Sequence, residues 1–116
     1  MREIKFRGKR SDNGEWVYGF YSEILGVEEG YYIINENDEY HVRPKTVGQY
    51  TGLKDKNGVE IYEGDIIQFE EYPPQKVRWY DCAFCVDDYL LADWYEGTVV
   101  IGNIHDNHEL LEKAGV

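Results

Sequence analysis

The sequence predicts an all-β fold, a small barrel or a sandwich, followed by one short helix. Apolar and polar residues alternate with a period of two along most of the 116-residue chain, as they do in half-buried strands. Turn signals rich in Gly, Asn and Asp separate these segments, and helical periodicity is seen only near the C-terminus. A chain of this length supports one core, so we expect a single domain over residues 1–116.

The N-terminal region, 1–46, is expected to consist of β-hairpins. Ile4 and Phe6 alternate with charged residues, which predicts a first strand that buries these two side chains and leaves Arg7 in water. Asn13-Gly14 is a strong signal for a hairpin turn. Further strands are expected over 16–25, 31–34 and 40–43, the last of them stopped by Pro44. One side of the strand over 16–25 carries Trp16, Tyr18, Phe20 and Ile24.

The segment VGQYTGLKDKNGVEIYEGDII, residues 47–67, could be a ligand-binding loop or the turns of a β-fold. Its glycines are too widely spaced to form one phosphate cradle, so we favour turns. Asn57-Gly58 is expected to supply two positive-φ positions of a hairpin turn. Gly64-Asp65 is then expected to turn the chain into a buried strand at Ile66-Ile67.

The C-terminal half predicts further strands and the helix. Alternation places Ile67 and Phe69 on one face of the first strand, and Val77 and Trp79 on the inner face of the next. The segment FCVDD, 84–88, continues the set, and TVVIGNI, 98–104, is apolar throughout, as in a strand buried on both faces or in a barrel. The helix is expected over 106–114, capped by Asp106 or Asn107 and ended by Gly115.

Charge and composition limit the possible partners. The formal net charge is −11, and five of the twelve Lys and Arg residues lie in the first ten positions, MREIKFRGKR. An acidic body repels phosphate backbones, so we expect no direct binding of nucleic acid. No apolar run is long enough to span a membrane and no secretory signal is visible, so we expect a cytoplasmic protein whose two cysteines are thiols.

Two cysteines and two histidines make a candidate zinc site, since this is a ligand set of structural zinc. Cys82 and Cys85 have the C-x2-C spacing, but His105 and His108 are closer together than the usual histidine pair. Alternation along a strand would also point the two thiols to opposite faces. We therefore expect small thiols and surface histidines, and no metal or other cofactor.

Acidic side chains are the second candidate, because paired carboxylates can hold Mg²⁺ or transfer protons. None of their spacings matches a calcium loop, and a solvated acidic face explains them without a site. We expect no catalytic residues among them. The candidates are Asp55, Glu60, Glu63, Asp65, Asp87, Asp88 and Asp93.

Eleven tyrosines and three tryptophans exceed what a small core absorbs easily, because each buried hydroxyl needs a partner. Half-exposed tyrosines make good interfaces, so we expect a non-enzymatic module that binds a protein, with partner-binding residues that the sequence does not identify. Exposed strand edges would also allow a homo-oligomer. Two alternatives stay open: an acidic mimic of nucleic acid that occupies a DNA-binding protein, and a metal-dependent enzyme.

Three segments together resemble the YopX family of phage and prophage proteins: REIKFRGK, GQYTGLKDKNGVEIYEGDII (48–67) and VVIGNIHDNHELLE (99–112). The resemblance implies a mainly-β fold with an SH3-like barrel, here over 47–105, and a phage origin with expression in the bacterial cytoplasm. It implies no catalytic residues. His105 and His108 stand where the family has other residue types, so a metal site would be peculiar to this protein.

Overall fold

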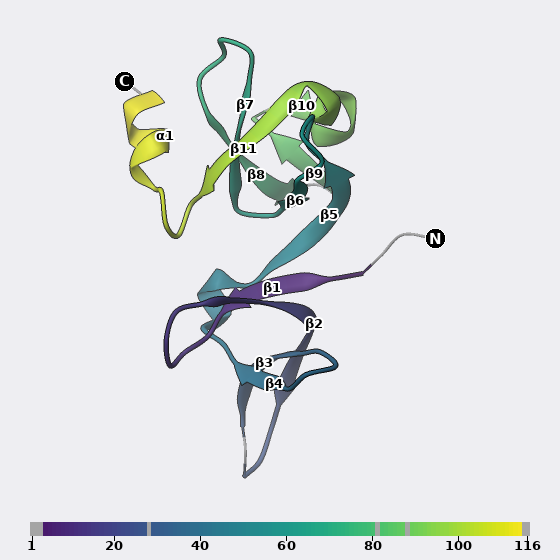
Figure 1. Ribbon diagram of the computed structural model, residues 1–116, viewed down its shortest axis with the longest axis vertical. Helices are drawn as coiled ribbons and strands as arrows, with labels where there is room; N and C mark the ends of the chain where they lie inside the picture. The colour runs from purple at the N-terminus through teal and green to yellow at the C-terminus, as the bar shows by residue number, and fades with distance from the viewer. Residues whose placement is uncertain (1–3, 28, 81, 88, 115–116) are drawn as a thin grey trace. The chain divides into compact units, whose positions relative to one another are not determined.

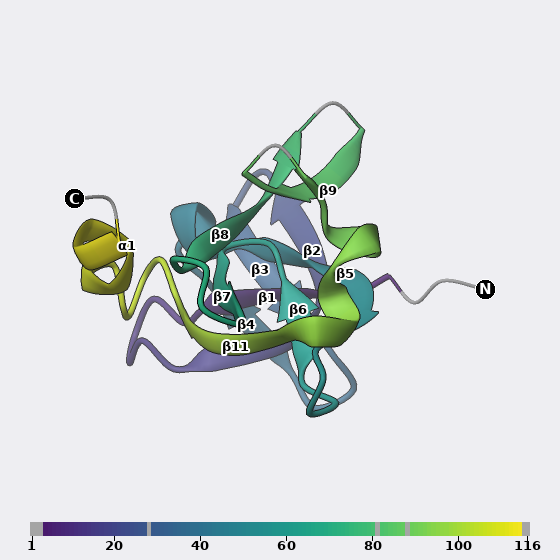
Figure 2. The same ribbon diagram turned by 90° about the horizontal axis from the view of Figure 1, so that it is seen from above.

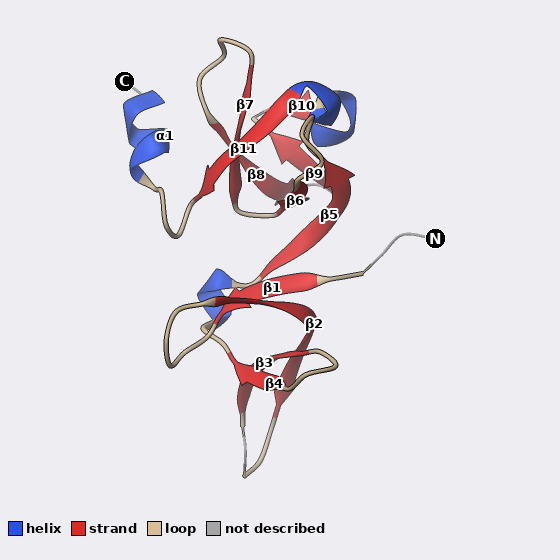
Figure 3. Ribbon diagram, viewed as in Figure 1, coloured by secondary structure: helices blue, strands red, loops and turns tan. Residues whose placement is uncertain are grey.

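The computed structural model describes residues 4–27, 29–80, 82–87 and 89–114. The chain divides into two compact units, Met1–Tyr50 and Thr51–Val116 (Figure 1). Strands are the main secondary structure of the described residues in both units (Figure 3), so the prediction of a mainly-β fold is confirmed. No helix in these ranges is long and apolar enough to cross a membrane.

One antiparallel sheet has six strands in the order β4-β3-β2-β1-β5-β6, and its strands from β4 to the start of β5 make up the first unit. The hairpin predicted at Asn13-Gly14 is confirmed: Gly14 has φ +74°, and the Arg10 N–H donates to the Glu15 carbonyl at 2.9 Å. Its elements are β1 (Phe6–Lys9), β2 (Trp16–Ile24), β3 (Gly30–Ile34), β4 (Glu39–His41), the 3-10 helix η1 (Pro44–Thr46) and the start of β5 (Gly48–Lys54).

The first strand differs from the prediction in which of its side chains are buried, although Phe6 and Arg7 do point to opposite faces. Ile4 is 61% exposed, whereas Arg7 is only 7% exposed. Gly8 shares a face with the small core of this unit, where a Cβ on Gly8 would lie 3.3 Å from Val42. Arg7 therefore points to the other face, where its guanidinium lies 4.6 Å from the centroid of the Trp16 ring. The alternation of residues within β1 could not predict that Trp16, on the neighbouring strand β2, covers the Arg7 side chain.

The second unit contains a five-stranded antiparallel sheet in the order β10-β9-β8-β7-β11. The strand β11 runs alongside β7 in both views (Figures 1 and 2). The elements are the end of β5, β6 (Glu60–Tyr62), β7 (Asp65–Phe69), β8 (Gln75–Tyr80), β9 (Ala83–Val86), β10 (Tyr89–Leu90), the 3-10 helices η2 (Leu91–Asp93) and η3 (Tyr95–Gly97), β11 (Thr98–Asn103) and α1 (Glu109–Ala114).

This sheet is open rather than closed into a barrel. Closure would require β10 to pair with β11, but the chain between them coils into η2 and η3. As the last strand in the order, β11 is buried at Thr98 and half-buried over the rest of its length, so it is not the doubly buried strand that its apolar sequence suggests.

The core of the second unit consists of aliphatic and aromatic side chains that meet across this sheet and the β6 hairpin: Ile61, Ile67, Val77, Phe84, Val86 and Leu91. Trp79, predicted to point inward, is 50% exposed. It lies near the end of β8 opposite Phe84, and the two rings meet edge to face at 4.8 Å. Phe84 belongs to the core, whereas Trp79 only contacts Phe84 at the edge of the core.

The turn at Asn57-Gly58 differs from the prediction in one respect. Gly58 has φ +82°, but Asn57 is not among the positive-φ residues of the described chain. The Gly58 N–H donates to the Asp55 carbonyl at 3.0 Å, and the Asp55 N–H donates to the Val59 carbonyl at 2.8 Å. A right-handed turn closed by one left-handed glycine thus replaces the turn with two positive-φ residues. The glycine turn into β7 is confirmed, with Gly64 at φ +93°.

A short C-terminal helix is confirmed as α1, but it begins at Glu109, three residues after the predicted start, so neither Asp106 nor Asn107 is the residue directly before it. The side chains of both expected caps bond to the end of β11: the Asn107 amide oxygen accepts from the Asn103 N–H at 3.2 Å, and the Asp106 carboxylate accepts from the Asn103 side-chain amide at 3.1 Å. The Leu110 N–H donates to the Asn107 carbonyl at 3.0 Å. Gly115, the expected stop, lies outside the described residues.

A candidate binding pocket lined by aromatic rings

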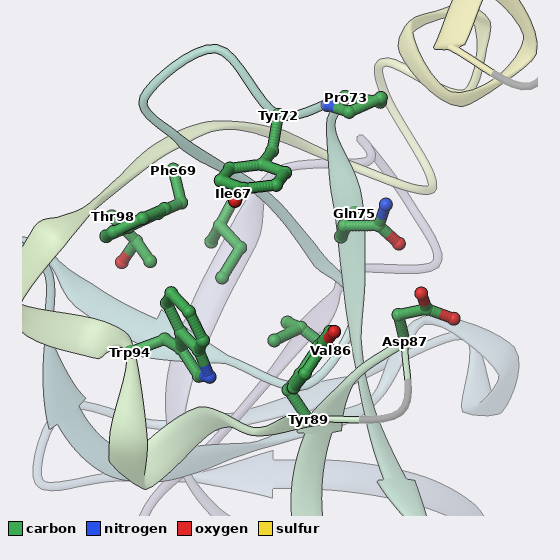
Figure 4. A pocket seen from close by; sticks show the side chains of 10 residues that line it. All are labelled: Ile67, Phe69, Tyr72, Pro73, Gln75, Val86, Asp87, Tyr89, Trp94 and Thr98. Atoms are coloured by element: carbon green, nitrogen blue, oxygen red, sulfur yellow. The ribbon is translucent and has the colours of Figure 1, made fainter.

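The second unit contains a pocket of about 130 Å³ between β7, β8, β9 and the turns that follow them (Figure 4). Ile67 and Val86, which belong to the core of this unit, form its apolar floor. Four aromatic side chains surround the opening, and four other residues complete the lining. The rings are Phe69, Tyr72, Tyr89 and Trp94, and the others are Pro73, Gln75, Asp87 and Thr98.

The rings hold one another in place. The Trp94 ring meets Phe69 edge to face at 4.9 Å and Tyr89 at 5.5 Å, and Phe69 lies 5.9 Å from Tyr72. Gly97 makes room for this arrangement, because a Cβ there would lie 2.3 Å from Cε2 of Phe69. The aromatic wall therefore depends on a glycine that follows it in the sequence.

Two strained turns present the exposed rings. Glu70 has φ +51° and Asp87 has φ +53°, a left-handed conformation that costs a residue with a Cβ about 1–2 kcal/mol. The first turn brings Tyr72 over the pocket, where its N–H donates to the Phe69 carbonyl at 3.0 Å. In the second turn, the Arg78 guanidinium donates to the Asp87 carbonyl at 2.9 Å. Strain of this kind is often kept where it positions functional side chains.

The candidate zinc ligands are not brought together. Cys82 is exposed, whereas Cys85 is buried and its thiol lies 3.8 Å from the Tyr80 carbonyl. His105 and His108 are exposed residues between β11 and α1. Within the described ranges, no three His, Cys, Asp or Glu side chains are grouped closely enough to hold a metal ion.

Asp55 is a structural residue rather than a free acid. It is 5% exposed, and its carboxylate accepts hydrogen bonds from the N–H groups of Asn57, Val59 and Val100 at 2.8–2.9 Å. Burial opposes ionisation, but these three bonds and nearby Lys56 outweigh it, so the pKa of Asp55 lies below its ordinary value. The carboxylate ties the turn after β5 to β11.

The other acidic candidates are dispersed. Asp65 is buried and accepts from the Tyr62 N–H at 2.7 Å, and Glu60 accepts from the Tyr62 hydroxyl at 3.1 Å. Glu63 is half-buried, Asp93 is exposed in η2, and Asp88 lies outside the described residues. Only Asp87 lines the pocket.

The sequence shows an excess of aromatic residues but does not identify the four rings that gather here. A signal was available, since Phe69, Tyr72, Tyr89 and Trp94 all follow the ends of predicted strands or lie close to them. No sequence pattern predicts the two 3-10 helices, η2 and η3, between which Trp94 lies in contact with Phe69.

Comparison with known proteins agrees with this architecture. The model of a family described as YopX protein matches residues 5–112. The crystal structure of protein EF1440 from Enterococcus faecalis is similar, with a TM-score of 0.61 and 25% sequence identity over 96% of this chain and 99% of that one. No curated protein matches the chain.

Proposed function

The chain belongs to the YopX protein family, and we propose that it is a non-enzymatic module that binds a partner protein through the aromatic pocket of its second unit. The observation that carries this proposal is the exposure of the rings: Tyr72 is 60% exposed and Tyr89 is 57% exposed. Next to Tyr89, Leu90 is 47% exposed and extends the apolar surface. Tyrosine and tryptophan supply large contact areas at low entropic cost, and they are enriched at protein interfaces.

The size of the pocket favours a partner's side chain over a substrate or cofactor. Its volume is about 130 Å³, whereas sites for small molecules usually enclose roughly 300–1,000 Å³. A hollow of this size with exposed rings around it resembles the pocket that receives one anchoring side chain at the centre of an interface. The partner would then cover Tyr72 and Tyr89.

The finer features that the family resemblance implies belong to the same proposal. The second unit would be an SH3-like fold, which is supported by its antiparallel strands. The protein would act in the cytoplasm of a bacterial host, where a phage or host factor would be its partner.

The test is affinity capture with three forms of the full chain, followed by mass spectrometry. The pocket variant combines Tyr72→Ala and Tyr89→Ala, two exposed positions whose truncation leaves the core intact. The control is Phe20→Ala, which removes a 64% exposed ring from the first unit. We expect a partner that the wild type and the control retain and the pocket variant loses. Equal capture by all three forms would refute the proposal.

The acidic-mimic alternative makes a different prediction in the same experiment. A net charge of −11 would hold a basic partner through many exposed carboxylates, so that binding would fall steeply with salt and be insensitive to the two tyrosines. Capture that survives both alanine substitutions but is lost on raising the salt concentration would favour the mimic.

A further inference from the structure

The pocket has a chemical character that its size alone does not explain, and this inference rests on the function proposed above. Aromatic rings and a carboxylate line the same pocket: Trp94 lies at one side, Gln75 and Asp87 lie at the opposite side, and Tyr89 lies between Trp94 and Asp87 (Figure 4). We propose that the pocket receives the guanidinium group of an arginine side chain presented by the partner protein.

The rings favour a cation. The face of an aromatic ring carries negative potential, and Trp is the strongest of the aromatic residues in attracting cations. This protein already uses the contact elsewhere, since Arg7 lies 4.6 Å from the Trp16 centroid and Arg78 lies 4.8 Å from the Tyr80 centroid. The Trp94 ring has the same chemistry and lines the pocket.

The charges around the opening also favour a cation. Asp87 is exposed at the rim. Glu70 and Glu71 belong to the turn that carries Tyr72, and both are exposed. The nearest cations on β8 are Lys76 and Arg78, which alternate with Gln75 and Val77 and therefore point to the other face of the strand. The Arg78 guanidinium bonds to the backbone carbonyl of Asp87, not to its carboxylate.

Arginine suits the pocket better than lysine. A guanidinium is planar and weakly hydrated, so it can stack on Trp94 above the apolar floor of Ile67 and Val86. Its N–H groups can at the same time donate to the Asp87 carboxylate and to the Gln75 amide oxygen. A lysine ammonium would supply the positive charge but not the planar surface that stacks on a ring. An apolar side chain would donate no hydrogen bond to Asp87 or Gln75.

The probes are three short Gly-Ser peptides that differ at one central residue: arginine, lysine or citrulline, which is the uncharged analogue of arginine. Each is titrated into the full-length protein, and the indole N–H resonance of Trp94, assigned by its loss in Trp94→Phe, is followed by NMR. We expect the arginine peptide to move this resonance saturably. The citrulline peptide should bind about two- to fivefold more weakly, the factor expected of an exposed cation–π contact.

Matched variants test the carboxylate. Asp87→Asn keeps the shape of the side chain and should weaken binding of the arginine peptide by about fivefold. Asp93→Asn removes the same charge from an exposed position in η2 and should leave binding unchanged.

The outcomes separate the two proposals. Equal binding of the arginine and citrulline peptides would overturn the arginine assignment while leaving a pocket that binds protein. Absence of any Trp94 shift with the arginine peptide would also overturn it. In either case the capture experiment with Tyr72→Ala and Tyr89→Ala still decides the proposed function independently.

Discussion

The carboxylate of Asp55 accepts a hydrogen bond from the backbone N–H of Val100 at 2.9 Å, across 45 residues of the chain. One residue further along, the Lys56 N–H donates to the Thr98 carbonyl at 3.0 Å. The turn at Gly58 is therefore attached to β11, the edge strand next to β7. Asp55 thus links the turn at Gly58 to β11. These hydrogen bonds explain why its carboxylate is buried, and no ligand is needed to explain it.

Removing the charge of Asp55 should destabilise the protein. In Asp55→Asn one side-chain oxygen becomes an N–H donor, which cannot accept a bond from a backbone N–H group. We expect the free energy of unfolding in urea at pH 7 to fall by about 1–3 kcal/mol, the cost of leaving a buried N–H group unpaired. Asp93→Asn, at an exposed position, is the control. A change below about 0.5 kcal/mol, the usual range for surface substitutions, would contradict this role.

The contribution of Asp55 should also depend on pH. Its pKa is lowered in the folded state, so the unfolded chain binds the proton more readily. The stabilisation is therefore complete above the unfolded pKa of about 4 and is lost as the pH falls through the folded pKa. The difference in unfolding free energy between the wild type and Asp55→Asn should shrink between pH 6 and pH 3, as followed by urea titrations. A difference that stays constant or grows over this range would be inconsistent with a lowered pKa.

Relieving the turn at Glu70 should stabilise the protein. Glycine adopts φ +51° without the steric cost that glutamate bears there, although it also loses more entropy on folding. We expect Glu70→Gly to raise the unfolding free energy by about 0.5–1 kcal/mol. Glu71→Gly removes the same charge from a residue that is not in this conformation and should not stabilise. If the two substitutions behave alike, the strain does not exist.

The two cysteines should differ in reactivity. Cys82 is exposed and should react with a thiol reagent in the folded protein, whereas buried Cys85 should react only after unfolding. Cys82→Ser should remove the fast reaction alone. Added Zn²⁺ should protect neither thiol, and protein purified without chelator should contain less than about 0.1 equivalent of zinc, since a structural site binds it tightly. One equivalent of zinc would contradict this arrangement.

The β-fold could be predicted because its signals are local. The alternation in KVRWY is the strand β8, and Asn13-Gly14 turns the first hairpin. The helix after Asn107 also depends on neighbouring residues alone. In these segments the period of the pattern and the chemistry of the turn are sufficient.

The burial of individual side chains was harder to predict because it depends on residues distant in sequence. Arg7 is covered by Trp16 from the next strand, while Trp79 lies where the core ends. The pocket was missed for the same reason. Trp94 lies between η2 and η3, which have no periodic pattern, and its position depends on Phe69 and on the absence of a side chain at Gly97.

Photocrosslinking from within the pocket tests directly whether the pocket binds a partner protein. A photoreactive phenylalanine derivative replaces Tyr72 in one form and Tyr80 in another, since both tyrosines are about 60% exposed in the second unit and only Tyr72 lines the pocket. After irradiation in the lysate used for affinity capture, we predict that position 72 crosslinks to the partner that is lost from the Tyr72→Ala and Tyr89→Ala variant, and that position 80 does not. Identical crosslinking from the two positions, or none from position 72, would contradict a partner-binding pocket.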